Sequence, residues 1–173
     1  DLNGREPYCY CIDGSECNGS QFNQANNILY FNNENNNNNV KLSNLKGLFK
    51  NCKDITSIDF QDFDFSEVND TSEMFQNCTS LTTINFGPIN ANKVIKMSYM
   101  LSNCSSLSNI DLTIFKNSLV NDMSYIFQNC SSLREIKLLD FKTSNVEKMD
   151  GMFELCSNLI NLEQNFDTSK VLS

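Results

Sequence analysis

Hydrophobic residues recur along this chain with a period of 26 residues. Five cysteines mark the period: Cys52, Cys78, Cys104, Cys130 and Cys156. An apolar residue stands three and six positions after each of them, as Leu107 and Ile110 do after Cys104. A fixed period of this length indicates a repeat architecture, in which each unit buries its apolar positions against the neighbouring units.

Two hydrophobic periods alternate inside each unit. Ile58 and Phe60, with a polar residue between them, show the alternation of a short strand. Later in the unit, positions such as Val146, Met149 and Met152 lie three residues apart, which favours one face of a helix. The pattern predicts a strand, a loop, a short helix and a tight return in each unit, which is one coil of a solenoid.

The ends of the predicted helices also have sequence signals. Ser144 followed by Glu147 predicts a capping box at the start of one helix. An asparagine stands directly before four of the periodic cysteines: Asn51, Asn77, Asn103 and Asn129. Asparagine tolerates the left-handed conformation that closes a helix, so we expect it to do so here.

The repeat pattern resembles known families. Residues 107–112, with the pattern Leu-x-x-Ile-x-Leu, resemble the leucine-rich repeat. Residues 129–153 are similar to the 26-residue surface-protein repeat of bacteria and protists, a variant leucine-rich repeat, through Asn-Cys-Ser-Ser-Leu-x-x-Ile-x-Leu, then Phe, then Ser-Asn-Val-x-x-Met-x-x-Met-Phe. The resemblance covers about 42–173. It implies an α/β, leucine-rich-repeat-like solenoid with a parallel sheet on one face and short helices on the other.

The same resemblance implies a location and a difference from the commoner repeat. Members of the family are secreted or surface-anchored and are associated with adhesion and cell-surface layers. Phe115 and Phe141 stand where the commoner leucine-rich repeat has an asparagine after its strand. We therefore expect this chain to lack that asparagine ladder. A family resemblance supports a fold and a location, and does not by itself assign an activity.

Two regions divide the chain. Residues 1–39 are rich in Cys and Asn and are predicted to form an N-terminal cap, with strands at Phe22 and at 28–31 that cover the first coil. Residues 40–173 are predicted to form the solenoid. It begins with a half unit at 40–51, and the full units start at Cys52, Cys78, Cys104, Cys130 and Cys156.

The eight cysteines favour an oxidising compartment. We expect two disulfides, with their connectivity left open, among four of them: Cys9, Cys11, Cys17 and Cys52. The other four are expected to be free, buried thiols stacked one per coil: Cys78, Cys104, Cys130 and Cys156. A linear stack lacks the convergent geometry of a metal site.

Composition narrows the function classes. The formal charge is −8, so a nucleic-acid partner is not expected. The chain has no His, which removes the commonest general base and most zinc sites, and we expect neither an enzyme nor a metal or cofactor. No apolar run approaches 18 residues, so membrane insertion is not expected.

Five sequons make glycans possible on a secreted chain, at Asn18, Asn69, Asn77, Asn103 and Asn129. The alternative is that the last three asparagines only close a turn before a buried cysteine. Asn18 and Asn69 are expected to be the more accessible.

The final unit gives the functional hypothesis. The chain starts with Asp1, which suggests a removed signal peptide or a fragment, and it stops at Ser173 within a unit. An open apolar end would be covered by a neighbouring copy, and a head-to-tail contact that does not close generates a filament. Candidate interface residues are Phe166, Val171, Leu172, Phe22, Tyr30, Asn35 and Asn37.

The sequence therefore predicts an extracellular structural protein, secreted or at the cell surface, whose partners are copies of itself. Glycans and other surface proteins are further candidate partners. The alternative is a cell-surface adhesin, or protein-binding leucine-rich-repeat module, cut from a longer chain.

Overall fold

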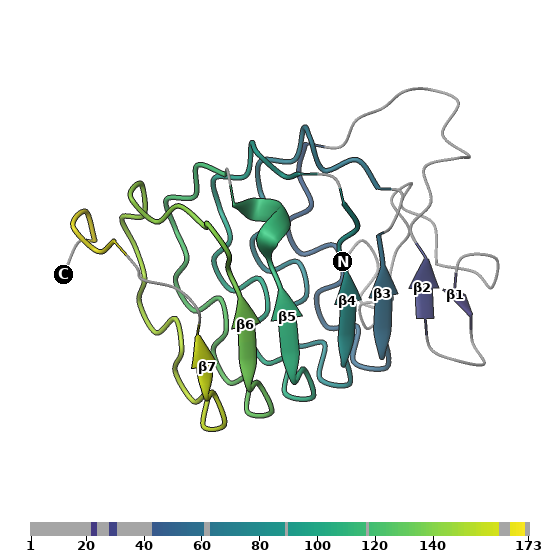
Figure 1. The fold of residues 1–173 in the computed structure, drawn as a ribbon. Coiled ribbons are helices and arrows are strands. Elements are labelled where there is room, and N and C mark those ends of the chain that lie inside the picture. The colour runs from purple at the N-terminus through teal and green to yellow at the C-terminus, as the bar shows by residue number, and fades with distance from the viewer. Residues whose placement is uncertain are drawn as a thin grey trace, which may run out of the picture.

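The computed structural model of the chain describes residues 43–60, 63–88, 90–116, 118–162 and 167–171, together with the backbone of 22–23 and 28–30. In the described part of the chain seven short strands follow one another (Figure 1): β1 (Phe22–Asn23), β2 (Ile28–Tyr30), β3 (Ser57–Asp59), β4 (Thr83–Asn85), β5 (Asn109–Asp111), β6 (Glu135–Lys137) and β7 (Asn161–Leu162). One 3-10 helix, η1 (Thr113–Phe115), lies after β5.

Strands from successive units pair in parallel at the period of the sequence. Ile58 of β3 lies opposite Ile84 of β4, and Ile110 of β5 lies opposite Ile136 of β6. At the other end of the chain β7 pairs with β6, while at the beginning β2 pairs in parallel with β3 and in antiparallel with β1. The sheet therefore grows by one strand with each coil.

The sheet is interrupted between the second and third coils. The strand order is β1-β2-β3-β4 in one sheet and β5-β6-β7 in the other. On the opposite side of the coils, parallel bridges run without a break through Asn44, Asp70, Lys96, Asp122 and Lys148. The backbone of this side therefore holds the coils together where the sheet does not.

The predicted short helices are wrong. Among the described residues these segments contain no α-helix, and their N–H groups alternate between two kinds of acceptor. The Phe75 N–H donates to the Met100 carbonyl of the next coil at 2.8 Å, whereas the Cys78 N–H donates back to the Phe75 carbonyl at 3.1 Å. The capping box fails for the same reason, because the Glu147 N–H donates to the Asn121 carbonyl of another coil.

Left-handed residues explain why the segments do not become helical. One row of positive φ contains Gly47, Glu73, Tyr99, Tyr125 and Gly151, and a second contains Asn51, Asn77, Asn103, Asn129 and Leu155. The expected left-handed conformation of the four asparagines is thus confirmed, although each closes a turn and not a helix. A residue in this conformation every four positions reverses the helical path, so the three-residue apolar spacing arises from a series of turns.

The core consists of the periodic apolar positions stacked upon one another. Phe49 and Phe75 are fully buried, and their rings stack with centroids 5.5 Å apart. Phe60 and Phe86, also one period apart, stack at 5.8 Å. Full burial of a side chain of this size contributes about 1.5–3 kcal/mol, so each coil is stabilised mainly by its neighbours.

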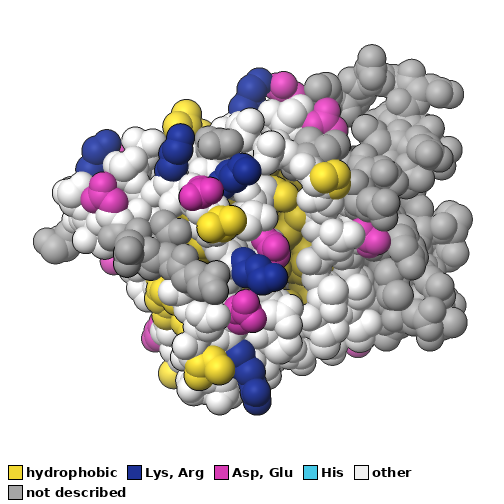
Figure 2. Space-filling model, in the orientation of Figure 1, with side chains coloured by type: hydrophobic (Ala, Val, Ile, Leu, Met, Phe, Trp, Pro, Cys, Tyr) yellow, Lys and Arg dark blue, Asp and Glu magenta, His cyan; other side chains and the backbone are white. Residues whose placement is uncertain are grey.

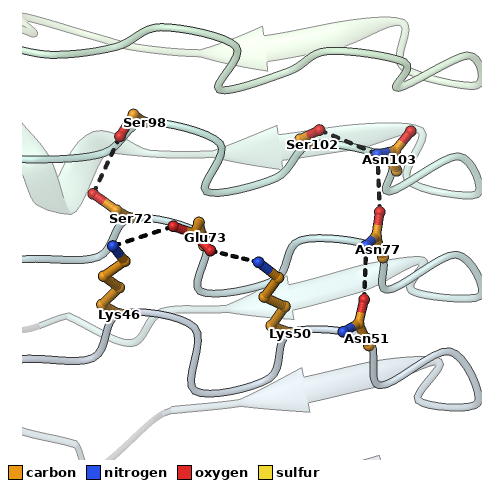
Figure 3. Close-up of polar contacts among 9 residues, drawn as sticks. All are labelled: Lys46, Lys50, Asn51, Ser72, Glu73, Asn77, Ser98, Ser102 and Asn103. Carbon is orange, nitrogen blue, oxygen red and sulfur yellow. Dashed lines mark hydrogen bonds and ion pairs between the residues drawn. The ribbon is translucent and has the colours of Figure 1, made fainter. Parts of the chain in front are cut away.

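A ladder of asparagine side chains runs along the corner before the cysteines (Figure 3). The Asn77 amide donates to Asn51 Oδ1 at 2.7 Å, the Asn103 amide to Asn77 Oδ1 at 2.9 Å, and the Asn129 amide to Asn103 Oδ1 at 2.7 Å. This ladder was not predicted from the sequence. It stands before the cysteines, whereas the ladder that was expected to be absent would stand at the position of Phe115 and Phe141.

Replacing Asn103 separates the two roles of this ladder. N103A removes the two ladder hydrogen bonds and the bond from the Asn103 amide to Ser102 Oγ, at about 1 kcal/mol each, and places a Cβ-bearing residue without a compensating side chain at φ 63°. N103G loses the same bonds, but glycine adopts a positive φ without steric strain. N103G should therefore be more stable than N103A by about 1 kcal/mol. Urea unfolding followed by circular dichroism measures the difference. N103A equal to or more stable than N103G would contradict this role.

Candidate functional site

The strands expose one polar face. On β4 and β5 the central isoleucines are buried, whereas Thr83, Asn85, Asn109 and Asp111 are exposed. Within each sheet the strands are in register, so exposed side chains one period apart lie side by side, and the Asn85 amide donates to Asp59 Oδ1 of the preceding coil at 2.9 Å. The face thus presents small amides, hydroxyls and carboxylates at fixed spacing.

The opposite face of the coils begins with an ion-pair cluster (Figure 3). Glu73 accepts from Lys50 Nζ at 2.6 Å and lies 3.3 Å from Lys46 Nζ. The hydrogen bond from Lys50 holds the pKa of Glu73 below its usual value, although burial acts against this. All three side chains are partly exposed, so the pairs contribute little to stability, and they fix charged groups on the surface.

Two tyrosines occupy the next coils at the position of Glu73. The rings of Tyr99 and Tyr125 stack with centroids 4.8 Å apart. A Cβ built on Gly151 would clash with the Tyr125 ring, so a larger residue at this position would require the ring to shift. This pair was not predicted from the sequence; the signal was the position five residues before each periodic cysteine, which is Gly, Glu, Tyr, Tyr and Gly in successive coils.

Charged side chains do not gather into one patch on the face shown in Figure 2. Acidic and basic groups are interspersed there, and hydrophobic side chains show as separate spots. Ile95, Leu119 and Leu139 are exposed apolar residues of the middle coils. Scattered exposed apolar residues are ordinary on protein surfaces, so we assign these no site.

The periodic cysteines lie inside the stack. Cys78, Cys104 and Cys130 are free and buried, and Cys156 is free and half-buried. Each thiol donates to a carbonyl of the preceding coil, for instance Cys78 to Phe49 O at 3.0 Å. Burial raises the pKa of Cys78 and of Cys130 to about 12, and it raises the pKa of Cys104 and Cys156 as well. The thiols therefore fill space and satisfy carbonyls.

Cys52 differs from the other periodic cysteines because it is disulfide-bonded. Its expected partners, Cys9, Cys11 and Cys17, lie outside the described residues. The connectivity stays a prediction.

The final coil exposes positions that are buried elsewhere. Phe127, Leu133 and Ile136 are fully buried, whereas their counterparts Phe153, Leu159 and Leu162 are only partly buried. Leu155 and Ile160 of the same coil are 65% and 82% exposed. The last described coil therefore has the most exposed apolar surface.

The structure places only part of the predicted assembly interface. Val171 is half-buried, and only the backbone of Phe22 and Tyr30 is described. The other candidates, Phe166, Leu172, Asn35 and Asn37, lie outside the described residues.

The sequons fall into two environments. Asn77, Asn103 and Asn129 are half-buried in the amide ladder, whereas Asn69 is exposed. Asn18 lies outside the described residues.

The described part of the chain offers no constellation for metal chemistry, since it contains no group of three or more acidic or cysteine side chains able to hold an ion. Within the same residues, none of the helices has the length and apolar character needed to cross a bilayer. What the described geometry does provide is two rigid faces with side chains in regular rows.

Thiol reactivity checks the burial of the cysteine ladder. At neutral pH iodoacetamide should alkylate Cys156 in the folded protein and leave Cys78, Cys104 and Cys130 unmodified, because a buried thiol with a raised pKa yields little thiolate. Unfolding in urea should make the extent of alkylation equal at all four cysteines. Peptide mass spectrometry measures each site, and equal alkylation before unfolding would contradict the buried ladder.

Solved structures with some similarity come from bacteria. A leucine-rich repeat protein from Bacteroides ovatus ATCC 8483 is 22% identical with a TM-score of 0.44, covering 76% of this chain and 35% of its own. One from Eubacterium ventriosum ATCC 27560 is 22% identical with a TM-score of 0.40, over 68% of this chain and 35% of its own. A leucine-rich repeat protein from T. pallidum is 13% identical with a TM-score of 0.31, over 78% of each chain. This chain thus spans 35% of the length of each of the first two.

No curated protein matches the chain. A family model matches it over two overlapping segments, residues 18–110 and 43–166. These segments include most of the chain, and they contain every described strand. The chain therefore belongs to the family described as Mycoplasma protein of unknown function, DUF285.

Proposed function

We propose that this chain is a repeat module of a cell-surface protein and that it binds other proteins through the exposed face of its strands. The observation that supports this is the alternation of burial along the strands: Thr83, Asn85, Asn109 and Asp111 are exposed on strands whose central residues are buried. A surface that is already ordered loses little conformational entropy when a partner binds.

The chemistry of this face suits a protein partner. Its amides, hydroxyls and carboxylates offer donors and acceptors along a row, and the Asn85 side chain is already oriented by Asp59. A net charge of −8 would accelerate encounter with a positively charged partner.

An extracellular location is supported by the cysteines. Cys52 is disulfide-bonded, and disulfides persist in oxidising compartments. The free thiols do not argue against it, because Cys78, Cys104 and Cys130 are buried from oxidants and from other thiols.

Photo-crosslinking on intact cells tests this function. A photoreactive amino acid at Asn109 or Asp111 should give a discrete adduct with another protein, because both side chains are exposed on the strand face. The matched control is Lys148, which is exposed on the opposite side of the coil. Adducts from the strand positions alone would support the proposal. No adduct, or the same adducts from Lys148, would count against it, as would failure of a cell-impermeant biotin ester to label the protein.

A second function, head-to-tail assembly, has its own supporting observation. Within the described residues, β7 pairs only with β6 and β1 pairs only with β2, so each of the two sheets has an open outer edge. These edges lie at opposite ends of the stack (Figure 1). An open edge beside partly buried apolar residues such as Leu159 and Leu162 invites a further strand.

The strand order limits how two copies could join. Because β2 already occupies the place beside β3, the first coil of one copy cannot stack directly on the last coil of another. The contact would instead bring β1 of one copy beside β7 of the next, which makes the N-terminal strands the joint.

Sedimentation velocity at increasing protein concentration tests the assembly. I160K places a charge beside β7 on a side chain that is 82% exposed, so it should lower association and leave folding unchanged. L119K is the matched control, because Leu119 is 57% exposed in a middle coil. Association that is equal in both variants, or a wild-type protein that stays monomeric at all concentrations, would refute head-to-tail assembly.

A further inference from the structure

We propose that Asn69 carries an N-linked glycan in the folded protein, and that the three periodic sequons at Asn77, Asn103 and Asn129 do not. The inference rests on the extracellular location proposed above, because the glycan donor is present only along the secretory route. All four sites have the same sequon, and they differ in whether the asparagine amide is exposed or hydrogen-bonded to the neighbouring coil.

Asn69 has a free side chain on a fully paired backbone. Its N–H donates to the Ser43 carbonyl at 2.7 Å, and its carbonyl accepts from the Ile95 N–H at 2.9 Å. The side chain is exposed, and its amide makes no hydrogen bond to any residue that the structure describes. A sugar on Nδ2 would therefore displace no interaction of the described fold and would project into solvent.

The three ladder asparagines have the opposite environment. Their Nδ2 atoms point at the Oδ1 atom of the preceding coil across 2.7–2.9 Å, as Figure 3 shows for Asn77 and Asn103. Coils paired like strands are about 4.8 Å apart, so a pyranose ring bonded to Nδ2 has no room between two of them. Each ladder asparagine also directly precedes a fully buried cysteine.

The modification itself is an ordinary transfer. The Nδ2 atom of Asn69 forms a bond to the anomeric carbon of a lipid-diphosphate-linked oligosaccharide and loses one proton. The bond from the anomeric carbon to the diphosphate oxygen breaks, and the lipid diphosphate leaves with the electron pair. No oxidant or reductant takes part.

Thr71 sets the time at which the transfer can happen. The transferase reads the hydroxyl of the third sequon residue, but in the fold Thr71 is fully buried and its Oγ1 donates to the Lys96 carbonyl at 3.2 Å. The sequon is accessible only before the coil containing Lys96 has packed on it. Glycosylation of Asn69 thus precedes folding of the second coil, and the folded protein is not a substrate. A glycan transferred to a ladder asparagine at the same stage would prevent the coils from packing, so chains that carry one are excluded from the folded fraction.

The position leaves the strand face open. Asn69 directly precedes Asp70, which belongs to the bridge ladder on the side of the coils opposite the strands. A glycan there would cover the first coils on that side, and Thr83, Asn85, Asn109 and Asp111 would stay available to a protein partner.

Expression with a heterologous signal peptide in a eukaryotic secretory host tests the proposal. The secreted, folded fraction is treated with peptide N-glycosidase in heavy-oxygen water, and occupancy at each sequon is read by peptide mass spectrometry. We expect the label at Asn69 and its absence from Asn77, Asn103 and Asn129. An unoccupied Asn69, or occupancy of any ladder asparagine in this fraction, would overturn it.

Two variants test the sequon, and in vitro transfer to the folded protein tests the timing. N69Q should abolish the glycan at this site with unchanged urea unfolding, because the side chain has no described partner. T71S keeps the sequon and should keep the glycan. Unglycosylated protein folded in bacteria and then incubated with transferase and donor should stay unmodified at Asn69 and become modified only after unfolding, and modification of the folded form would contradict the timing.

The outcome is independent of the native location. Because the signal peptide is supplied, the sequon test can succeed even if the biotin labelling of native cells fails, and it can fail even if that labelling succeeds.

Discussion

Backbone hydrogen bonding between successive coils is the constraint on which the rest of this structure depends. Alternate N–H groups, such as that of Phe75, donate to a carbonyl of the next coil, and the intervening groups close turns within the coil. Buried backbone groups must be paired, so every coil has to return to the same position after the same number of residues. A constant period along the stack follows from this requirement, and the left-handed residues recur at fixed positions of that period.

Because the backbone repeats, the side chain at a given position of one unit contacts the side chain at the same position of the next unit. Phe49 stacks on Phe75, the Asn77 amide donates to Asn51, and each free thiol donates to a carbonyl of the previous coil. These rows are stabilising only when neighbouring units carry compatible residues, which is why the pattern is strict inside the stack. In the last described coil the same positions have no following coil among the described residues, and Phe153 and Leu162 are correspondingly more exposed.

The side chains that point outward do not need to match those of the neighbouring units. Function can therefore differ between coils at these positions. The first left-handed row carries Gly, Glu or Tyr, although a side chain in this conformation costs about 1 kcal/mol relative to glycine. The cost is tolerated because the inter-coil bonds fix the backbone, as the Glu73 N–H does by donating to the Ser98 carbonyl. The proposed roles of this chain, a protein-binding strand face and a glycan at Asn69, both use residues of this unrestricted kind.

The sequence by itself determined the repeat, the strand positions, the buried residues and the left-handed asparagines, because each depends on contacts that recur with every period. It did not determine the structure of the second half of the unit. There, the spacing of Val146, Met149 and Met152 fits a helical face and a series of turns equally well. Only the tertiary structure decided between them, because the turns gain hydrogen bonds to a neighbouring coil that an isolated helix cannot form. For the same reason the amide ladder and the Tyr99–Tyr125 pair became visible only when the coils were stacked.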